Sequence, residues 1–148
     1  PEEFKTLKLS FRASPKYALA LAAIFLFVSA GVVVVFTMGL KMYLADIYAR
    51  KAMAAGRTQT KINYLNRAVA LAPYQDSYYL ALANNYMALA NQAALNRKDQ
   101  TEIGVNLSAA IENGKKAVEI NPNKASNNES LALIYEQFLE YVMHLWVL

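Results

Sequence analysis

The feature that most constrains this chain is a run of 24 residues without a charged side chain, Tyr17 to Leu40. Only Ser29 and Thr37 within it are ordinary polar residues. Each residue of an α-helix adds ~1.5 Å, so the run reaches ~36 Å, whereas a hydrocarbon layer is ~30 Å thick. The run therefore predicts a transmembrane helix over residues 15–41 that holds the rest of the chain at a lipid bilayer.

A secretory signal fits this run less well. Such a signal has an apolar region of ~7–15 residues that ends at a small-residue cleavage site. The only candidate site here, Ser29-Ala30-Gly31, is followed by the apolar residues 32–36, so cleavage would leave half of the segment behind. A buried core helix is the remaining alternative.

The flanks of the run are basic. In the lead-in of residues 1–14, helical spacing would set Phe4, Leu7 and Phe11 beside three basic side chains, which is typical either of an interfacial helix or of an ordinary basic juxtamembrane loop. Ser14-Pro15 is a favourable helix start. Three Lys/Arg precede the run closely and two follow it, which favours a cytoplasmic N-terminal flank and places the rest of the chain outside the cytoplasm.

The charge distribution limits the possible partners, and the cysteine content limits the possible chemistry. Residues 1–41 carry a net charge of +3 and residues 42–148 a net charge of +1, so the high pI of about 9.3 comes mostly from the membrane flank. We therefore expect no nucleic-acid partner. The chain has no cysteine, which excludes disulfide and thiolate chemistry.

The part after the run contains an internal repeat. Residues 65–73 (LNRAVALAP) and 114–122 (GKKAVEINP) share Ala-Val, an aliphatic residue and a closing proline at the same offsets. A second shared pattern follows each proline, Leu82-Ala83-x-x-Tyr86 after the first and Leu131-Ala132-x-x-Tyr135 after the second. Internal repetition of this kind predicts stacked helical units that bury their faces against each other.

These motifs resemble the tetratricopeptide repeat (TPR) family, whose 34-residue helix-turn-helix unit carries W-x2-L-G-x2-Y, then A-x3-F and a late proline. The resemblance covers residues 42–148 and implies an all-α fold, in which one transmembrane helix is followed by a TPR-like solenoid whose last unit is incomplete. The first-helix signature falls on Tyr79, Leu82, Ala83 and Tyr86, and the second-helix positions fall on Ala110, Gly114, Ala117 and Pro122. In the neighbouring units, Asn128 replaces the large aromatic residue and Ala45 replaces tryptophan.

The spacing of the repeat predicts one elongated helical hairpin. Pro73 and Pro122 lie 49 residues apart, which is about two turns per helix more than the family unit provides. Asp99-x-x-Glu102 has the pattern of a capping box that starts the second long helix. We expect helices at 58–71, 75–96, 100–120 and 125–147, and the membrane helix continues toward Gly56.

The sequence contains no recognisable set of catalytic, cofactor-binding or metal-binding residues. It lacks a phosphate-binding glycine loop, a nucleophile elbow and a pair of histidines at metal spacing. The single His144 and the dispersed carboxylates are expected on solvated or packed helix faces. We therefore expect no enzymatic activity and no cofactor in this segment.

Binding is the role that the resemblance implies, because the first helices of TPR units line a concave groove. Family geometry would direct Ser77, Leu80, Asn84 and Met87 into it. Asn84 matches an asparagine of the carboxylate-clamp members, but Leu80 stands where they have lysine, which disfavours a carboxylate clamp. A second candidate surface is the helical stripe of Phe138, Tyr141, Val142 and Leu145, which we expect to be covered by further repeats, by another copy or by a partner.

Three functions remain open from the sequence. The first is a membrane-anchored scaffold that binds a protein or peptide through its repeats. The second is the non-catalytic C-terminal segment of a polytopic bacterial glycan enzyme, because the order of basic lead-in, span and repeats resembles the end of some O-antigen ligases and polymerases. In that case the chemistry would lie upstream of Pro1. The third is a bitopic assembly or secretion factor whose repeats do the docking.

Overall fold

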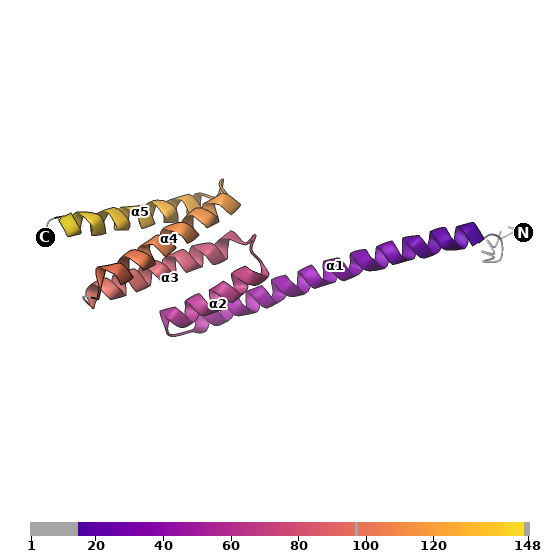
Figure 1. The fold of residues 1–148 in the computed structure, drawn as a ribbon, viewed down its shortest axis with the longest axis horizontal. Helices are drawn as coiled ribbons and strands as arrows, with labels where there is room; N and C mark the ends of the chain where they lie inside the picture. The colour runs from indigo at the N-terminus through magenta and orange to yellow at the C-terminus, as the bar shows by residue number, and fades with distance from the viewer. Residues whose placement is uncertain (1–14, 97, 147–148) are drawn as a thin grey trace, which may run out of the picture. The chain divides into compact units, whose positions relative to one another are not determined.

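The computed structural model describes residues 15–96 and 98–146, which are helical apart from the short connections and include no strand. The all-α prediction is therefore confirmed for this part of the chain. The helices are α1 (Pro15–Ala54), α2 (Thr58–Leu71), α3 (Asp76–Leu95), α4 (Gln100–Ile120) and α5 (Ala125–Trp146) (Figure 1). The lead-in of residues 1–14, with the helix start expected at Ser14, lies outside the described residues.

Helix α1 contains the charge-free run and continues to Ala54, as predicted. Its segment Tyr17–Ala54 has a mean hydropathy of 2.8 in its most apolar window, and none of that window is buried. The helix is long and apolar enough to cross a membrane. The contacts of the chain divide it into two units, Pro1–Leu40 and Lys41–Leu148, one residue before the predicted boundary.

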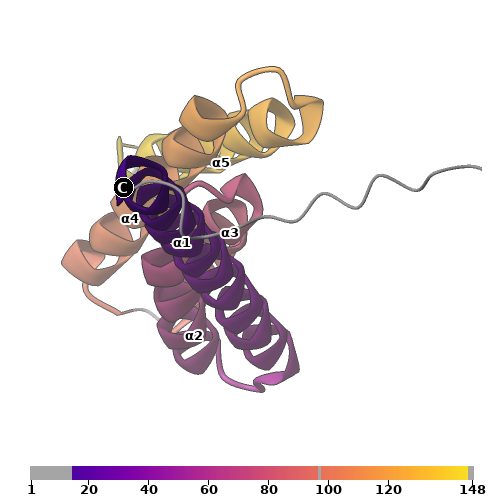
Figure 2. The ribbon, with the colours of Figure 1, turned by 90° about the vertical axis from the view of Figure 1, so that its right-hand side faces the viewer.

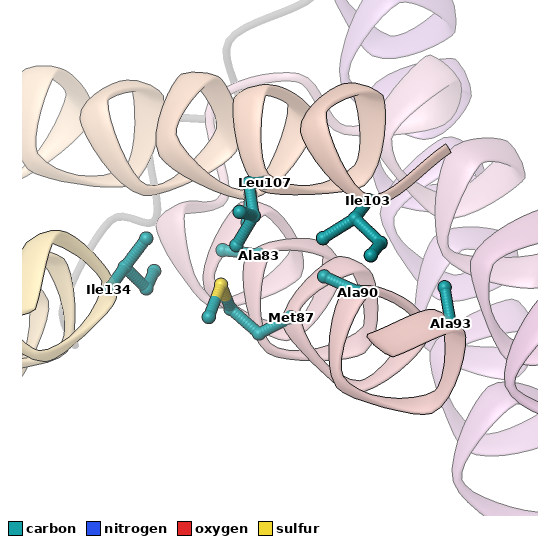
Figure 3. Close-up of a cluster of buried hydrophobic side chains, with 8 residues drawn as sticks. Ala83, Met87, Ala90, Ala93, Ile103, Leu107 and Ile134 are labelled. Atoms are coloured by element: carbon teal, nitrogen blue, oxygen red, sulfur yellow. The ribbon is translucent and has the colours of Figure 1, made fainter. Parts of the chain in front are cut away.

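In the second unit, the long helices α3 and α4 form an antiparallel hairpin, and Figure 2 gives a second view of it. Small and aliphatic side chains at helical spacing pack between the two helices, so each helix presents one continuous apolar face to the other. Figure 3 shows this cluster, to which α5 contributes one residue. Its buried members are Ala83, Met87, Ala90, Ala93, Ile103, Leu107, Ala110 and Ile134.

A second region of the core joins the end of α1, α2 and α3. Ala52, Ile62, Leu65 and Leu82 form one buried cluster there, and four alanines form another beside it. Tyr86 packs against both this region and the α3–α4 cluster. The tyrosine of the repeat motif therefore connects the two parts of the core.

The connections after α2 and after α4 have the same backbone geometry. The C-cap Ala72 has φ −137° and ψ 73°, and the C-cap Asn121 has φ −139° and ψ 79°. Each cap N–H donates to the carbonyl oxygen of the repeat alanine four residues earlier, Ala68 or Ala117. A proline follows each cap, which disfavours the helical conformation at the residue before it. The sequence repeat is thus also a repeat of local structure.

The start of α4 differs in part from the predicted capping box. The Asp99 side chain accepts a hydrogen bond from the Thr101 N–H at 3.3 Å, so Asp99 is the N-cap. The Glu102 carboxylate accepts instead from the Lys98 ammonium at 3.0 Å. In a capping box, the Glu102 carboxylate would accept a hydrogen bond from the backbone N–H of Asp99. Here it pairs with Lys98 instead.

The two copies of the repeat motif differ in burial. Leu82 and Ala83 on α3 are both buried: Leu82 packs with residues of α1 and α2, and Ala83 packs in the α3–α4 cluster. Their counterparts on α5 are more open: Leu131 is half-buried and Ala132 is exposed, and Tyr135, the counterpart of the half-buried Tyr86, remains 37% exposed. No further helix of the described residues follows α5 to cover them.

Candidate binding groove

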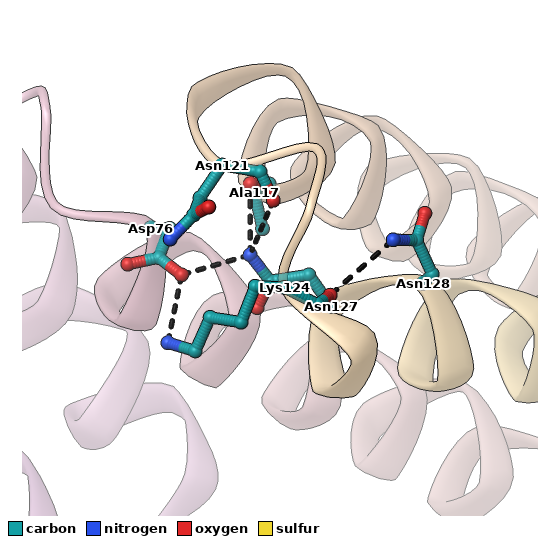
Figure 4. A network of polar contacts seen from close by, with 6 residues as sticks. All are labelled: Asp76, Ala117, Asn121, Lys124, Asn127 and Asn128. Carbon is teal, nitrogen blue, oxygen red and sulfur yellow. Dashed lines mark hydrogen bonds and ion pairs between the residues drawn. The ribbon is translucent and has the colours of Figure 1, made fainter.

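A network of polar groups fixes the start of α5 against the start of α3 (Figure 4). Asn127, which is fully buried, donates through Nδ2 to Asp76 Oδ2 at 2.8 Å and to the Ala117 carbonyl oxygen at 3.0 Å. The Lys124 ammonium lies 2.8 Å from the same Asp76 oxygen. The Asn127 amide therefore joins α5 to both α3 and α4, and Lys124 of the α4–α5 connection binds the same carboxylate. This network positions the start of α5 against the hairpin.

The charge on Asp76 is stabilised by its partners. The hydrogen bonds from Lys124 and Asn127 lower the pKa of Asp76 below its usual value, and burial of the carboxyl group opposes them only in part. Asp76 is thus ionised at neutral pH although it is only 8% exposed. The network is an ionic contact that holds the two helices together.

Further along the same two helices there is an open groove between α3 and α5. It has a volume of about 290 Å3. Its apolar floor is formed by the buried Met87 and Ile134, and the exposed Leu133 stands at its α5 edge. Uncharged polar side chains complete the lining. The complete lining is Asn84, Met87, Ala88, Asn91, Ser130, Leu133, Ile134 and Gln137, which we call the α3–α5 groove.

The polar lining of the α3–α5 groove suits peptide groups. Asn84, Asn91 and Gln137 each offer one acceptor and two donors, and Ser130 adds a hydroxyl group. Asn84 and Asn91 are exposed, whereas the neighbouring Asn85 donates to the Ala81 carbonyl of its own helix at 2.7 Å. The groove can therefore accept an extended chain whose backbone pairs with amides and whose apolar side chains rest on the floor.

A second hollow lies on the other side of α3, between that helix, α2 and the last part of α1. Its volume is about 360 Å3, and Ser77, Tyr78, Asp46 and Lys61 are among the residues that line it. Burial of the phenol, together with the nearby Asp46 carboxylate, raises the pKa of Tyr78 above its usual value. Asp46 is itself paired with Arg50 at 2.8 Å, and Lys61 is the other charged side chain of the lining.

The structure divides the predicted peptide groove between these two hollows. Asn84 and Met87 line the α3–α5 groove, although Met87 is mostly buried and forms its floor. Ser77 lines the hollow beside α1 and α2. Leu80 is half-buried and belongs to neither lining. Of the four predicted residues, Asn84 is the one that is exposed within a groove.

The predicted stripe on α5 is not its open face. Phe138 and Tyr141 pack against the core cluster of the α3–α4 hairpin, and Val142 is half-buried. The side chain of Leu145 lies outside the described residues. The stripe points inward because α5 uses that face to cover the hairpin, and the open face instead carries Ala132, Leu133, Tyr135, Leu139 and Met143.

The α5 side of the groove was missed at the level of sequence, although the repeat contained the signal. An offset of 49 residues relates Leu133 to Asn84, Ser130 to Ala81 and Gln137 to Ala88. Asn84 and Ala88 line the α3–α5 groove from α3, and their counterparts Leu133 and Gln137 line it from α5. Ala81, the counterpart of Ser130, lines the hollow beside α1 and α2 instead. Applying the offset to the predicted groove residues would have identified Leu133 directly.

No protein-family model, curated protein or solved structure matches the chain. Its interpretation therefore depends on its own geometry. Within residues 15–96 and 98–146, no three His, Cys, Asp or Glu side chains come together as a metal site. Surfaces for binding among these residues include the two hollows beside α3 and the open face of α5.

Proposed function

We propose that this chain is a membrane-anchored, TPR-like scaffold that binds a protein or peptide segment in the groove between α3 and α5. In this proposal α1 spans a lipid bilayer, and helices α2 to α5 form the binding part. The observation that carries the proposal is the α3–α5 groove, an open groove with an apolar floor and amide side chains around it.

The membrane anchor is supported by the exposure of α1. A core helix of a water-soluble protein would bury its apolar face, but residues such as Phe25, Phe27 and Phe36 are each at least 70% exposed. Large apolar side chains surround this helix on all sides, which is typical of a span in lipid.

The TPR-like interpretation is supported by the repeated turn. The two C-caps, Ala72 and Asn121, share their dihedral angles and their hydrogen bond to the repeat alanine. In stacked repeats, each unit buries its face against the next one. The packing of α3 against α2, α4 and α5 is consistent with that principle.

The same function fits a longer parent protein. If the chain is the end of a polytopic O-antigen ligase or polymerase, the catalytic residues belong to other spans. The groove would then recruit a protein partner to the enzyme. The proposal for the groove is the same in both settings.

Photocrosslinking in membranes tests the proposal. A photoreactive phenylalanine analogue is placed at Asn84 or Asn91 in the groove, and at Val105 or Glu112 on the exposed side of α4 as matched controls. All four positions tolerate a large side chain, because each is exposed.

The expected result is one discrete protein adduct from the groove positions that is absent from the α4 positions. Equal adducts from both faces, or none from the groove while the protein stays in the membrane fraction, would contradict the proposal. Release of the chain by alkaline carbonate would contradict the anchor separately.

A further inference from the structure

We infer that the segment bound in the α3–α5 groove is an extended peptide that carries lysine or arginine, and not an acidic segment or a free carboxyl terminus. This inference rests on the proposed function and names its partner class. The observation behind it is the charge of the two helices that form the groove.

An acidic row follows the groove on α5. Glu129, Glu136 and Glu140 are all exposed, and they stand four residues before, three after and seven after Leu133. Positions at these spacings share one face of a helix. Since Leu133 lines the groove and is 52% exposed, the three carboxylates lie along the same edge.

No positive charge on these helices balances the row. Between Asp76 and Leu95, and between Ala125 and Met143, there is no lysine or arginine. Lys124, just before α5, is held by Asp76 at 2.8 Å and so compensates that carboxylate. The groove therefore has a negative edge above a neutral lining, which repels a carboxylate and attracts a cation.

The spacing of the row defines a register. Along a helix, Glu129 to Glu136 spans ~10.5 Å, and Glu136 to Glu140 spans ~6 Å. An extended chain advances ~3.3 Å per residue and points successive side chains to opposite faces, so cations two residues apart share a face and lie ~6.6 Å apart, which matches the second interval. A third cation, three residues earlier, lies ~10 Å away but starts from the opposite face. The long, flexible stem of lysine lets this third ammonium group turn back toward Glu129. The complementary pattern is Lys-x-x-Lys-x-Lys, with an apolar residue between the first two lysines for the floor.

The inference is tested by binding of one labelled peptide series to the full chain in nanodiscs of neutral phosphatidylcholine. The peptides share the core Lys-Ala-Leu-Lys-Ala-Lys, and in two variants all three lysines become glutamine or glutamate. Neutral lipid removes attraction to the membrane itself. Fluorescence anisotropy gives the dissociation constants.

The protein variants are Glu136→Gln with Glu140→Gln, and as a matched control Glu112→Gln with Glu119→Gln on α4. Both pairs change the net charge by the same amount at exposed positions. The α4 pair also removes the exposed Lys116–Glu119 ion pair at 2.8 Å, which contributes little to folding. We expect the lysine peptide to bind best and the glutamate peptide worst. The α5 pair should weaken the lysine peptide roughly tenfold, since two ion pairs at a surface rim are lost.

Three outcomes would overturn the inference: equal affinity across the peptide series, equal loss in the α4 control pair, or no binding of the lysine peptide at millimolar concentration. None of them affects the photocrosslinking at Asn84, which tests the proposed function without regard to peptide charge. If the groove positions form a crosslinked adduct but peptide affinity does not depend on charge, the basic partner is rejected and the proposed scaffold function is retained.

Discussion

Gly114 lies where α4 packs closely against α5, and its replacement by alanine tests how closely those helices pack. A Cβ at this position would lie 3.0 Å from Leu131 Cδ1 and 3.3 Å from Ile134 Cδ1. Alanine in place of glycine inside a helix stabilises by ~1 kcal/mol, but overpacking a filled site costs ~1–3 kcal/mol. Because Ile134 is buried and cannot move aside freely, we expect Gly114→Ala to destabilise the protein by ~0–2 kcal/mol.

Gly104→Ala is the matched control on the same helix. No atom lies within 4 Å of the position that its Cβ would occupy, so only the gain in helix propensity remains. We expect this variant to be more stable than the unmodified chain by ~1 kcal/mol.

Thermal unfolding of the full chain in detergent, followed by circular dichroism, measures both variants. The expected gap of ~1–3 kcal/mol corresponds to at least ~4 °C in melting temperature. If Gly114→Ala melts at or above Gly104→Ala, α5 does not pack against α4 as described and the argument from close approach is refuted.

Three further predictions concern the same unit. The pKa of Asp76 is lowered in the folded state, so its charge stabilises the fold above the unfolded-state pKa of ~3.9. This stabilisation is lost as the pH falls through the lower folded-state pKa. Asp76→Asn should therefore cost ~1–2 kcal/mol at pH 7, and progressively less in unfolding curves measured below pH ~4. The buried Tyr141 hydroxyl has no hydrogen-bond partner among the described residues. Tyr141→Phe should therefore be neutral or stabilise the fold by up to ~1 kcal/mol in a denaturant titration, and a clear loss of stability would contradict this placement of the hydroxyl. Ile134→Ala should cost ~2–5 kcal/mol and Leu139→Ala under ~0.5 kcal/mol, and equal losses would mean that α5 is rotated from its described position.

Much of the fold could be predicted from the sequence because its signals are local. The prolines at positions 73 and 122 end α2 and α4, Asp99 caps α4, and the apolar spacing fixes the intervening helices. All four helices after Gly56 begin and end within one residue of the expected positions. Such boundaries depend on capping residues and prolines, whose effect on the backbone is local.

The direction in which helix faces point was harder to predict. Phe138 and Tyr141 were expected on an open stripe, yet they cover the α3–α4 hairpin. The choice between two apolar faces of α5 is decided by the Asn127 contact with Asp76, which joins residues 51 positions apart. Periodicity identifies an apolar face but does not say which neighbour it meets.

The candidate groove was predicted in part for the same reason. Asn84 was identified from a family pattern, and it lies in the α3–α5 groove. Ser77 follows the same helix but faces a different hollow, because α1 and α2 lie on that side of α3. The acidic row on α5 has no meaning for binding until the position of Leu133 in the groove is known.

The central claim is that α3 and α5 stand side by side and leave a groove between them. The most direct test is the distance between spin labels at Asn91 on α3 and Gln137 on α5, measured by pulsed electron paramagnetic resonance in lipid nanodiscs. The chain has no cysteine, so both labelling sites can be introduced without other changes. A single narrow distance distribution is predicted, whereas a broad one would show that α5 does not form a wall of the groove.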